Sequence, residues 1–114
     1  MGLFGGNEAE KLEKLAEKGK GDKVVELLRK KSTDKDTLLK GLEICGKLGG
    51  EDPVNFITEK LQDADPDVRI AAGKAALATG TDYMKTSVQQ MLGSEKDQKV
   101  IDAVRAVYRE KYMK

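Results

Sequence analysis

Apolar residues in this chain recur three and four positions apart in seven successive stretches, with polar or glycine-containing breaks between them. This is the spacing of one face of an α-helix, and it predicts seven helices. No stretch alternates apolar and polar residues in the manner of a strand, and no Asn-Gly or Asp-Gly pair marks a tight hairpin. The pattern therefore predicts an all-α fold.

The clearest helix is expected to begin at residue 66, because both of its ends carry specific signals. Asp65 is a typical N-cap residue, and Pro66 follows at the first helical position, where its missing N–H costs nothing. Gly80 suits the left-handed conformation that ends many helices. Alanines crowd one side of this helix and allow a neighbouring helix to approach closely. We therefore expect it in the middle of a stack.

The helix that follows is expected to begin with Thr81 as its N-cap and to end near Gly93. Its inner face is predicted from the larger apolar side chains: Tyr83, Met84, Val88, Met91 and Leu92. In the last helix, Tyr108 and Tyr112 are more typical of core or end-capping residues than of platforms on which bases stack.

The seven helices group into one leading helix, residues 8–19, and three two-helix repeats at about residues 22–50, 52–80 and 81–114. The second helices align on Leu38, Val68 and Val100, at spacings of 30 and 32 residues. A fixed period of two-helix units is typical of a helical solenoid, and an ordinary helical bundle is the alternative. Residues 1–7 are predicted to be a flexible tail, with a weak membrane or partner anchor as the alternative.

The segment from Asp65 to Leu77, DPDVRIAAGKAAL, resembles the second helix of a HEAT repeat in its short prokaryotic form. The resemblance is close over residues 54–80 and looser on either side. It implies a short right-handed α-α superhelix of the armadillo type, whose second helices line a concave surface. It also implies that Asp65 or Asp67, together with Arg69, makes hydrogen bonds between neighbouring repeats.

The composition narrows the chemistry that this chain can perform. The chain has 21 Lys and Arg against 20 Asp and Glu, a net charge of +1, which is less basic than is usual for a protein built to hold nucleic acid. It has no His and one Cys, so the usual catalytic triads and a structural zinc site lack their residues. A single Cys suits a reducing, cytoplasmic compartment, and no apolar run reaches the length of a transmembrane helix.

Two features are candidates for chemical sites. Asp63, Asp65 and Asp67 could share a proton or resemble part of a calcium loop in spacing, but a helix cap facing water is the favoured interpretation. Cys45 lies between Leu42 and Leu48 at helical spacing, which favours a buried core residue over a reactive thiol. We therefore predict no catalytic residue, no metal and no cofactor.

The resemblance favours a non-enzymatic protein–protein interaction or scaffold module that binds its partner on the face of the second helices. The candidate contacts are Lys40, Glu43, Lys47, Arg69, Lys74, Lys99, Asp102 and Arg105. One alternative is a helical-repeat protein that binds nucleic acid in a basic groove; another is an accessory to a lyase-type enzyme. Three repeats are near the minimum for a solenoid, so a monomer or a weak homo-oligomer is expected.

Overall fold

The computed structural model describes residues 3–30 and 34–113, with side chains from residue 8 to 29 and from 34 to 113. Within these ranges every regular element is a helix, as predicted. The helices are α1 (Leu3–Glu17), α2 (Gly21–Lys30), α3 (Lys35–Leu48), α4 (Glu51–Lys60), α5 (Pro66–Thr79), α6 (Asp82–Ser94) and α7 (Gln98–Tyr112). None of these helices is both long and apolar enough to cross a membrane.

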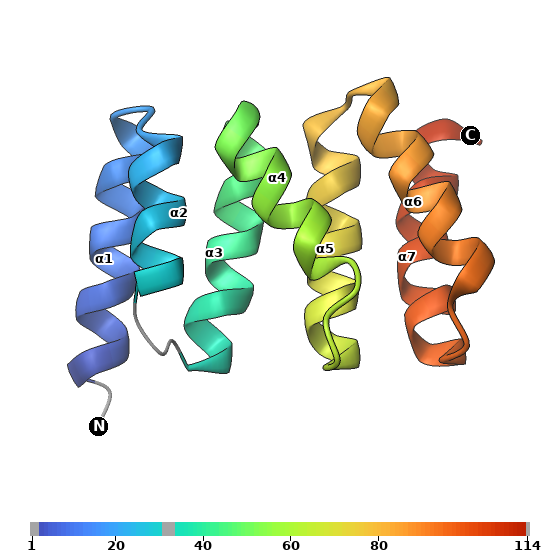
Figure 1. Ribbon diagram of the computed structural model, residues 1–114, viewed down its shortest axis with the longest axis horizontal. Helices are drawn as coiled ribbons and strands as arrows, with labels where there is room; N and C mark the ends of the chain where they lie inside the picture. The colour runs from blue at the N-terminus through green and yellow to red at the C-terminus, as the bar shows by residue number, and fades with distance from the viewer. Residues whose placement is uncertain (1–2, 31–33, 114) are drawn as a thin grey trace.

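The helices form two layers that extend along the longest dimension of the molecule, 38 Å (Figure 1). In the second-helix layer α1 packs on α3, α3 on α5, and α5 on α7. The first-helix layer consists of α2, α4 and α6, which pack against the second-helix layer from one side. The leading helix α1 therefore packs on α3 as one second helix packs on the next. It covers a face of α3 that would otherwise be exposed.

The predicted signals at both ends of α5 are confirmed. The Asp65 side chain accepts a hydrogen bond from the Asp67 backbone N–H at 2.9 Å, and Pro66 occupies the first turn. Gly80 has a φ of 75° and ends the helix in the left-handed conformation. Thr81 is also the N-cap of α6, where its hydroxyl accepts from the Met84 N–H at 3.2 Å. These local signals work because each satisfies a backbone group that the helix leaves unpaired.

The predicted start of the first helix is wrong, because α1 begins at Leu3 rather than near residue 8. Residues 3–7, assigned to a flexible tail, belong to the helix, whereas residues 1 and 2 lie outside the described residues. Gly5 and Gly6 suggested a break because each weakens a helix by about 1 kcal/mol relative to Ala. Glycine lowers helix propensity without blocking helical dihedral angles, so a helix can include both.

The predicted alignment of the repeats is off by one residue in the first repeat. The N-caps of the second helices are equivalent aspartates, 31 and 32 residues apart: Asp34, Asp65 and Asp97. On this alignment Thr37, not Leu38, is equivalent to Val68, and both of these side chains are buried. A polar residue occupies this core position in α3, and the apolar residue beside it, Leu38, matches the helical spacing instead.

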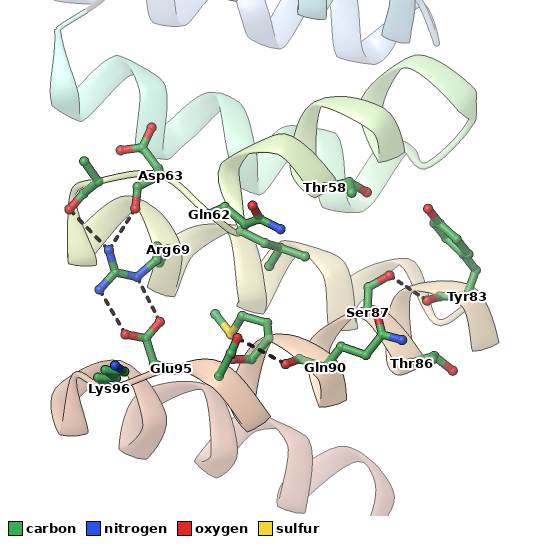
Figure 2. Close-up of a pocket in the computed structure, with 14 residues that line it drawn as sticks. Thr58, Gln62, Asp63, Arg69, Tyr83, Thr86, Ser87, Gln90, Glu95 and Lys96 are labelled. Atoms are coloured by element: carbon green, nitrogen blue, oxygen red, sulfur yellow. Dashed lines mark hydrogen bonds and ion pairs between the residues drawn. The ribbon is translucent and has the colours of Figure 1, made fainter.

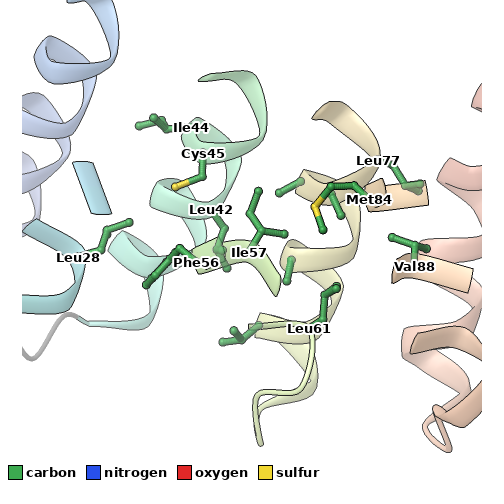
Figure 3. Close-up of a cluster of buried hydrophobic side chains, with 14 of the residues drawn as sticks. Leu28, Leu42, Ile44, Cys45, Phe56, Ile57, Leu61, Leu77, Met84 and Val88 are labelled. Carbon is green, nitrogen blue, oxygen red and sulfur yellow. The ribbon is translucent and has the colours of Figure 1, made fainter. Parts of the chain in front are cut away.

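A single apolar core runs between the two layers from α1 to α7. Its central part is shown in Figure 3, where Phe56 and Ile57 of α4 and Leu42 and Cys45 of α3 are among the buried side chains. The second helices approach closely at glycines. A Cβ atom added to Gly46 of α3 would lie 2.8 Å from the backbone of Ala75 in α5. At this crossing the backbones of α3 and α5 are therefore in direct contact, with no side chain from Gly46 between them.

Candidate functional site

A cleft of about 700 Å³ opens in the first-helix layer between α4 and α6 (Figure 2). One wall is the last turn of α4 with the loop that follows it, from Thr58 to Ala64, and the other is the length of α6 from Tyr83 to Ser94. Leu61 and Met91 contribute apolar surface to the lining and are themselves buried. The volume lies within the range of about 300–1,000 Å³ that is typical of ligand sites.

The cleft exists because α4 and α6 pack on α5 rather than closely on each other. At the neighbouring junction, α2 and α4 are in contact. There Arg29 donates two hydrogen bonds to Glu59, at 3.0 and 2.7 Å, and its guanidinium lies 5.1 Å from the centre of the Phe56 ring. No comparable pair joins α4 to α6 in the described part of the chain, where the facing side chains are mostly uncharged and polar.

Arg69, at the start of α5, closes one end of the cleft. Its guanidinium donates to both carboxylate oxygens of Glu95, at 2.9 and 3.0 Å, and to the backbone carbonyls of Asp63 and Ala64, at 2.8 and 3.2 Å. The side chains of Arg69 and Glu95 are only 17% and 6% exposed. The hydrogen bonds from Arg69 hold the pKa of Glu95 below its usual range. The pair thus joins α5 to the loop before α7.

Three hydroxyl groups in the lining of the cleft donate their protons within their own helices. Thr58 donates to the Val54 carbonyl at 2.8 Å, and Ser87 donates to the Tyr83 carbonyl at 3.0 Å. Ser94 likewise donates to the Met91 carbonyl at 3.3 Å. Because each hydroxyl donates back to its own helix, its oxygen lone pairs remain as acceptors. The hydroxyls therefore offer acceptors to a ligand.

Two glutamines face this space from opposite walls, Gln62 after α4 and Gln90 on α6 (Figure 2). Both side chains are exposed, and neither side-chain amide group makes a hydrogen bond to a described residue. Tyr83, at the other end of the cleft from Arg69, is 62% exposed. The prediction that Tyr83 belongs to the inner face of α6 is therefore wrong, because Met84 takes the buried position beside it.

Two of the eight candidate contacts lie on different surfaces. Arg69 lies in the cleft, whereas Arg105 lies at the far end of the stack, beside Tyr108 and the exposed Met113. Asp102 accepts from Gln98 at 2.8 Å. Three of the lysines have carboxylate partners: Lys40 with Glu13 at 3.4 Å, Lys47 with Glu43 at 3.9 Å, and Lys99 with Asp67 at 3.5 Å. Lys74 is exposed and forms no ion pair with any described residue.

Ion pairs connect the N-termini of the three second helices. Asp67 of α5 lies 2.7 Å from the amino group of Lys35 in α3 and 3.5 Å from that of Lys99 in α7. Lys35 is also 3.2 Å from Asp65. The two lysines flank Asp67 in sequence at equal spacing, which was a detectable signal of the repeat. The inter-repeat role of Asp65, Asp67 and Arg69 stays a prediction, for which these contacts are the geometric basis.

The remaining candidate groups have structural explanations. Cys45 is fully buried, as predicted, and burial raises the pKa of its thiol to about 12, so it is not a thiolate near neutral pH. In the part of the chain that the structure describes, no three His, Cys, Asp or Glu side chains are grouped so that they could hold a metal ion.

Comparison with protein-family models gives one finding: the model described as HEAT repeats matches residues 21–109. The matched region begins at α2 and ends within the last turns of α7, so it includes all three two-helix units. Searches of curated proteins and of solved structures give no match.

Proposed function

The chain belongs to the HEAT-repeat family, whose repeats generally serve as protein-interaction scaffolds and are typically non-enzymatic, and we propose that it binds another protein in the cleft between α4 and α6. The single observation that carries the proposal is this cleft of about 700 Å³, with its open lining of polar and apolar groups between two helices that both pack on α5. Concave sites with a few well-placed polar groups are the usual places for specific binding.

Rigid packing around the cleft supports this function. The α6 wall is held in the core by the buried side chains of Met84, Val88 and Met91. The Arg69–Glu95 pair closes one end of the cleft. A partner that enters a preformed site orders few protein side chains, so little binding free energy is lost to conformational entropy.

The face of the second helices stays a prediction as a partner surface, and we rank it second. A partner there would have to desolvate ion pairs such as Lys40–Glu13 and Lys47–Glu43, which are already satisfied. Removing such pairs from water offsets much of the gain from new contacts. The same carboxylates interrupt the basic stripe that a nucleic-acid backbone would need, so we favour a protein partner.

Site-specific photo-crosslinking distinguishes the two surfaces. A photoreactive amino acid would replace the exposed Thr86 on α6 in one variant and the exposed Glu43 on α3 in the other. Each variant would be expressed in the native host, irradiated, and its crosslinked proteins identified by mass spectrometry.

We expect a specific protein crosslinked from position 86 and absent from position 43. Crosslinks only from position 43 would transfer the proposal to the second-helix face. If neither position captured a protein, the proposed function would be wrong. Circular dichroism of both purified variants checks that each retains the helical fold.

A further inference from the structure

On the basis of the protein-binding function proposed above, we propose that the cleft binds an extended, uncharged peptide segment. The side-chain amides of Gln62 and Gln90 form hydrogen bonds to the main chain of this peptide. The lining offers hydrogen-bonding groups of both kinds but almost no unpaired charge. A segment of this description is what such a surface complements.

The charges around the cleft are largely neutralised within the protein. Arg69 and Glu95 use their charged groups on each other, as described above. The Asp63 carboxylate accepts from the Asp65 N–H at 2.9 Å and lies 3.8 Å from the amino group of Lys60. Lys96 is the lining residue that brings a charge without an ion pair to a described residue, and it stands at the Arg69 end. A charged ligand would therefore gain little attraction along most of the cleft.

The glutamine amides match the chemistry of a peptide backbone. Each amide carries two N–H donors and one carbonyl acceptor, and in the described chain neither group of Gln62 or Gln90 is engaged. The Thr58 and Ser87 oxygens add acceptors to the lining, because their own protons are donated to helix carbonyls. Peptide C=O groups can accept from the glutamines, while peptide N–H groups donate to the hydroxyl oxygens.

The shape of the lining favours an extended occupant over a helix. A docked amphipathic helix needs a continuous apolar groove, whereas here the apolar surface of Leu61 and Met91 is interrupted by polar side chains such as Gln62. The α6 wall has 13 residues and so is about 20 Å long. About six residues of an extended chain span that length at roughly 3.3 Å per residue. Tyr83, exposed at one end, can then pack against a side chain of the peptide.

The test uses the whole chain and a phage-displayed library of fully randomised ten-residue peptides. Peptides would be selected in 0.5 M salt and in 0.05 M salt, synthesised with blocked ends, and added to protein carrying ¹⁵N in its glutamine side chains. We expect uncharged sequences that shift the side-chain NH₂ signals of Gln62 and Gln90. Their Kd should change by less than about twofold between the two salt concentrations.

Matched variants test the role of the amides. Gln62→Met and Gln90→Met retain side-chain length and remove the hydrogen-bonding groups, so each should weaken peptide binding by roughly three- to tenfold. Gln98→Met is the control, because Gln98 lies on α7 outside the cleft and bonds to Asp102. This variant should bind the peptide with unchanged affinity.

The outcomes separate this proposal from the function on which it rests. If the selected peptides are acidic or basic and their binding weakens with salt, or if no selected peptide moves the Gln62 and Gln90 signals, the peptide proposal is wrong. A crosslinked partner from position 86 would still support the protein-binding function in that case. Equal affinity of the wild type and both glutamine variants would also overturn main-chain recognition.

Discussion

Neighbouring repeats pack closely in one layer of this molecule and stand apart in the other. In the second-helix layer, Gly46 of α3 and Gly73 of α5 face the next helix so closely that an added Cβ would lie 2.8 Å from it. In the first-helix layer, α4 and α6 are separated by a cleft of about 700 Å³. The same stack is therefore closed on one side and open on the other.

The difference follows from the size and polarity of the facing residues. Small residues let helix axes approach until backbones touch, which leaves no room for a ligand. On the open side both walls carry side chains, many of them polar, whose hydrogen bonds can be satisfied by water or by a partner. The two walls of the open layer, α4 and α6, are thus both positioned by α5 of the closed layer.

The largest expected effect comes from opening the closed layer. In Gly46→Val the new Cβ would start 2.8 Å from the Cα and carbonyl oxygen of Ala75, and the two added methyl groups would crowd the crossing further. Overpacking against a backbone should lower the free energy of unfolding by about 3 kcal/mol. Urea denaturation followed by circular dichroism measures this.

Gly93→Val is the matched control for that prediction. Gly93 is also helical, but a Cβ added there meets no atom within 4 Å, so we expect a change of about 0.5 kcal/mol or less. Equal losses in the two variants would mean that the close α3–α5 contact at Gly46 does not set the cost.

The next largest effect is expected from the Arg69–Glu95 ion pair, which closes one end of the cleft in the open layer. Since Arg69 lowers the pKa of Glu95, the pair stabilises the folded state fully above the usual Glu pKa of about 4.3 and loses this contribution as the pH falls through the lowered value. Glu95→Gln should therefore unfold at a lower temperature than the wild type at pH 7. The gap should narrow at pH 3.

Thermal unfolding of both proteins at the two pH values provides the measurement. Glu43→Gln serves as the control, since Glu43 is exposed and 3.9 Å from Lys47. A gap between Glu95→Gln and the wild type that persisted unchanged at pH 3 would contradict a charge-based role for the pair.

A smaller effect is expected along the row of second-helix N-termini. Asp67→Asn removes the carboxylate between Lys35 and Lys99, whose side chains are all substantially exposed. We expect a slight fall in the melting temperature at low salt that disappears in 1 M salt, where charges are screened beyond about 3 Å. Asp102→Asn is the control without a lysine partner. A loss that did not depend on salt would contradict a charge-based role for Asp67, because the N-cap of α5 is Asp65 and the variant retains the Asp67 N–H that bonds to it.

The smallest effect is expected at the rim of the cleft. Tyr83 is 62% exposed, so Tyr83→Ala should change the free energy of unfolding by about 0.5 kcal/mol or less. Chemical denaturation is again the measurement. A loss of more than about 1 kcal/mol would show that the cleft wall is part of the folding core and not a free surface.

Much of the fold was predictable because its signals are local. Asp65, Pro66 and Gly80 define α5 within about fifteen neighbouring positions, and each satisfies or removes a backbone group at a helix end. The repeat was also visible, although Thr37 at a core position shifted its alignment by one residue. The first helix was placed too late because glycines weaken helices without forbidding them.

The candidate site was far less predictable. Arg69 was expected between repeats or on a partner surface, but nothing near it in sequence indicated that Glu95, 26 residues later, would receive its guanidinium. The polar stripe of α6, from Tyr83 through Ser87 and Gln90 to Ser94, is at helical spacing and could have been noticed. Its apolar neighbours instead led to the interpretation of Tyr83 as a core residue.

For this protein, then, the sequence by itself determined the helices, most of their ends and the repeating two-helix unit, because these depend on hydrogen bonds and apolar spacing within about thirty residues. Only the tertiary structure decided that α4 and α6 stand apart, which groups lie across the gap, and that Arg69 is tied to Glu95. Those outcomes depend on how closely α3, α5 and α7 approach one another. The approach is close where Gly46 meets the Ala75 backbone and Gly73 meets Val104. The alanines of α5 predicted a close approach, but local sequence signals do not encode which residues meet at it.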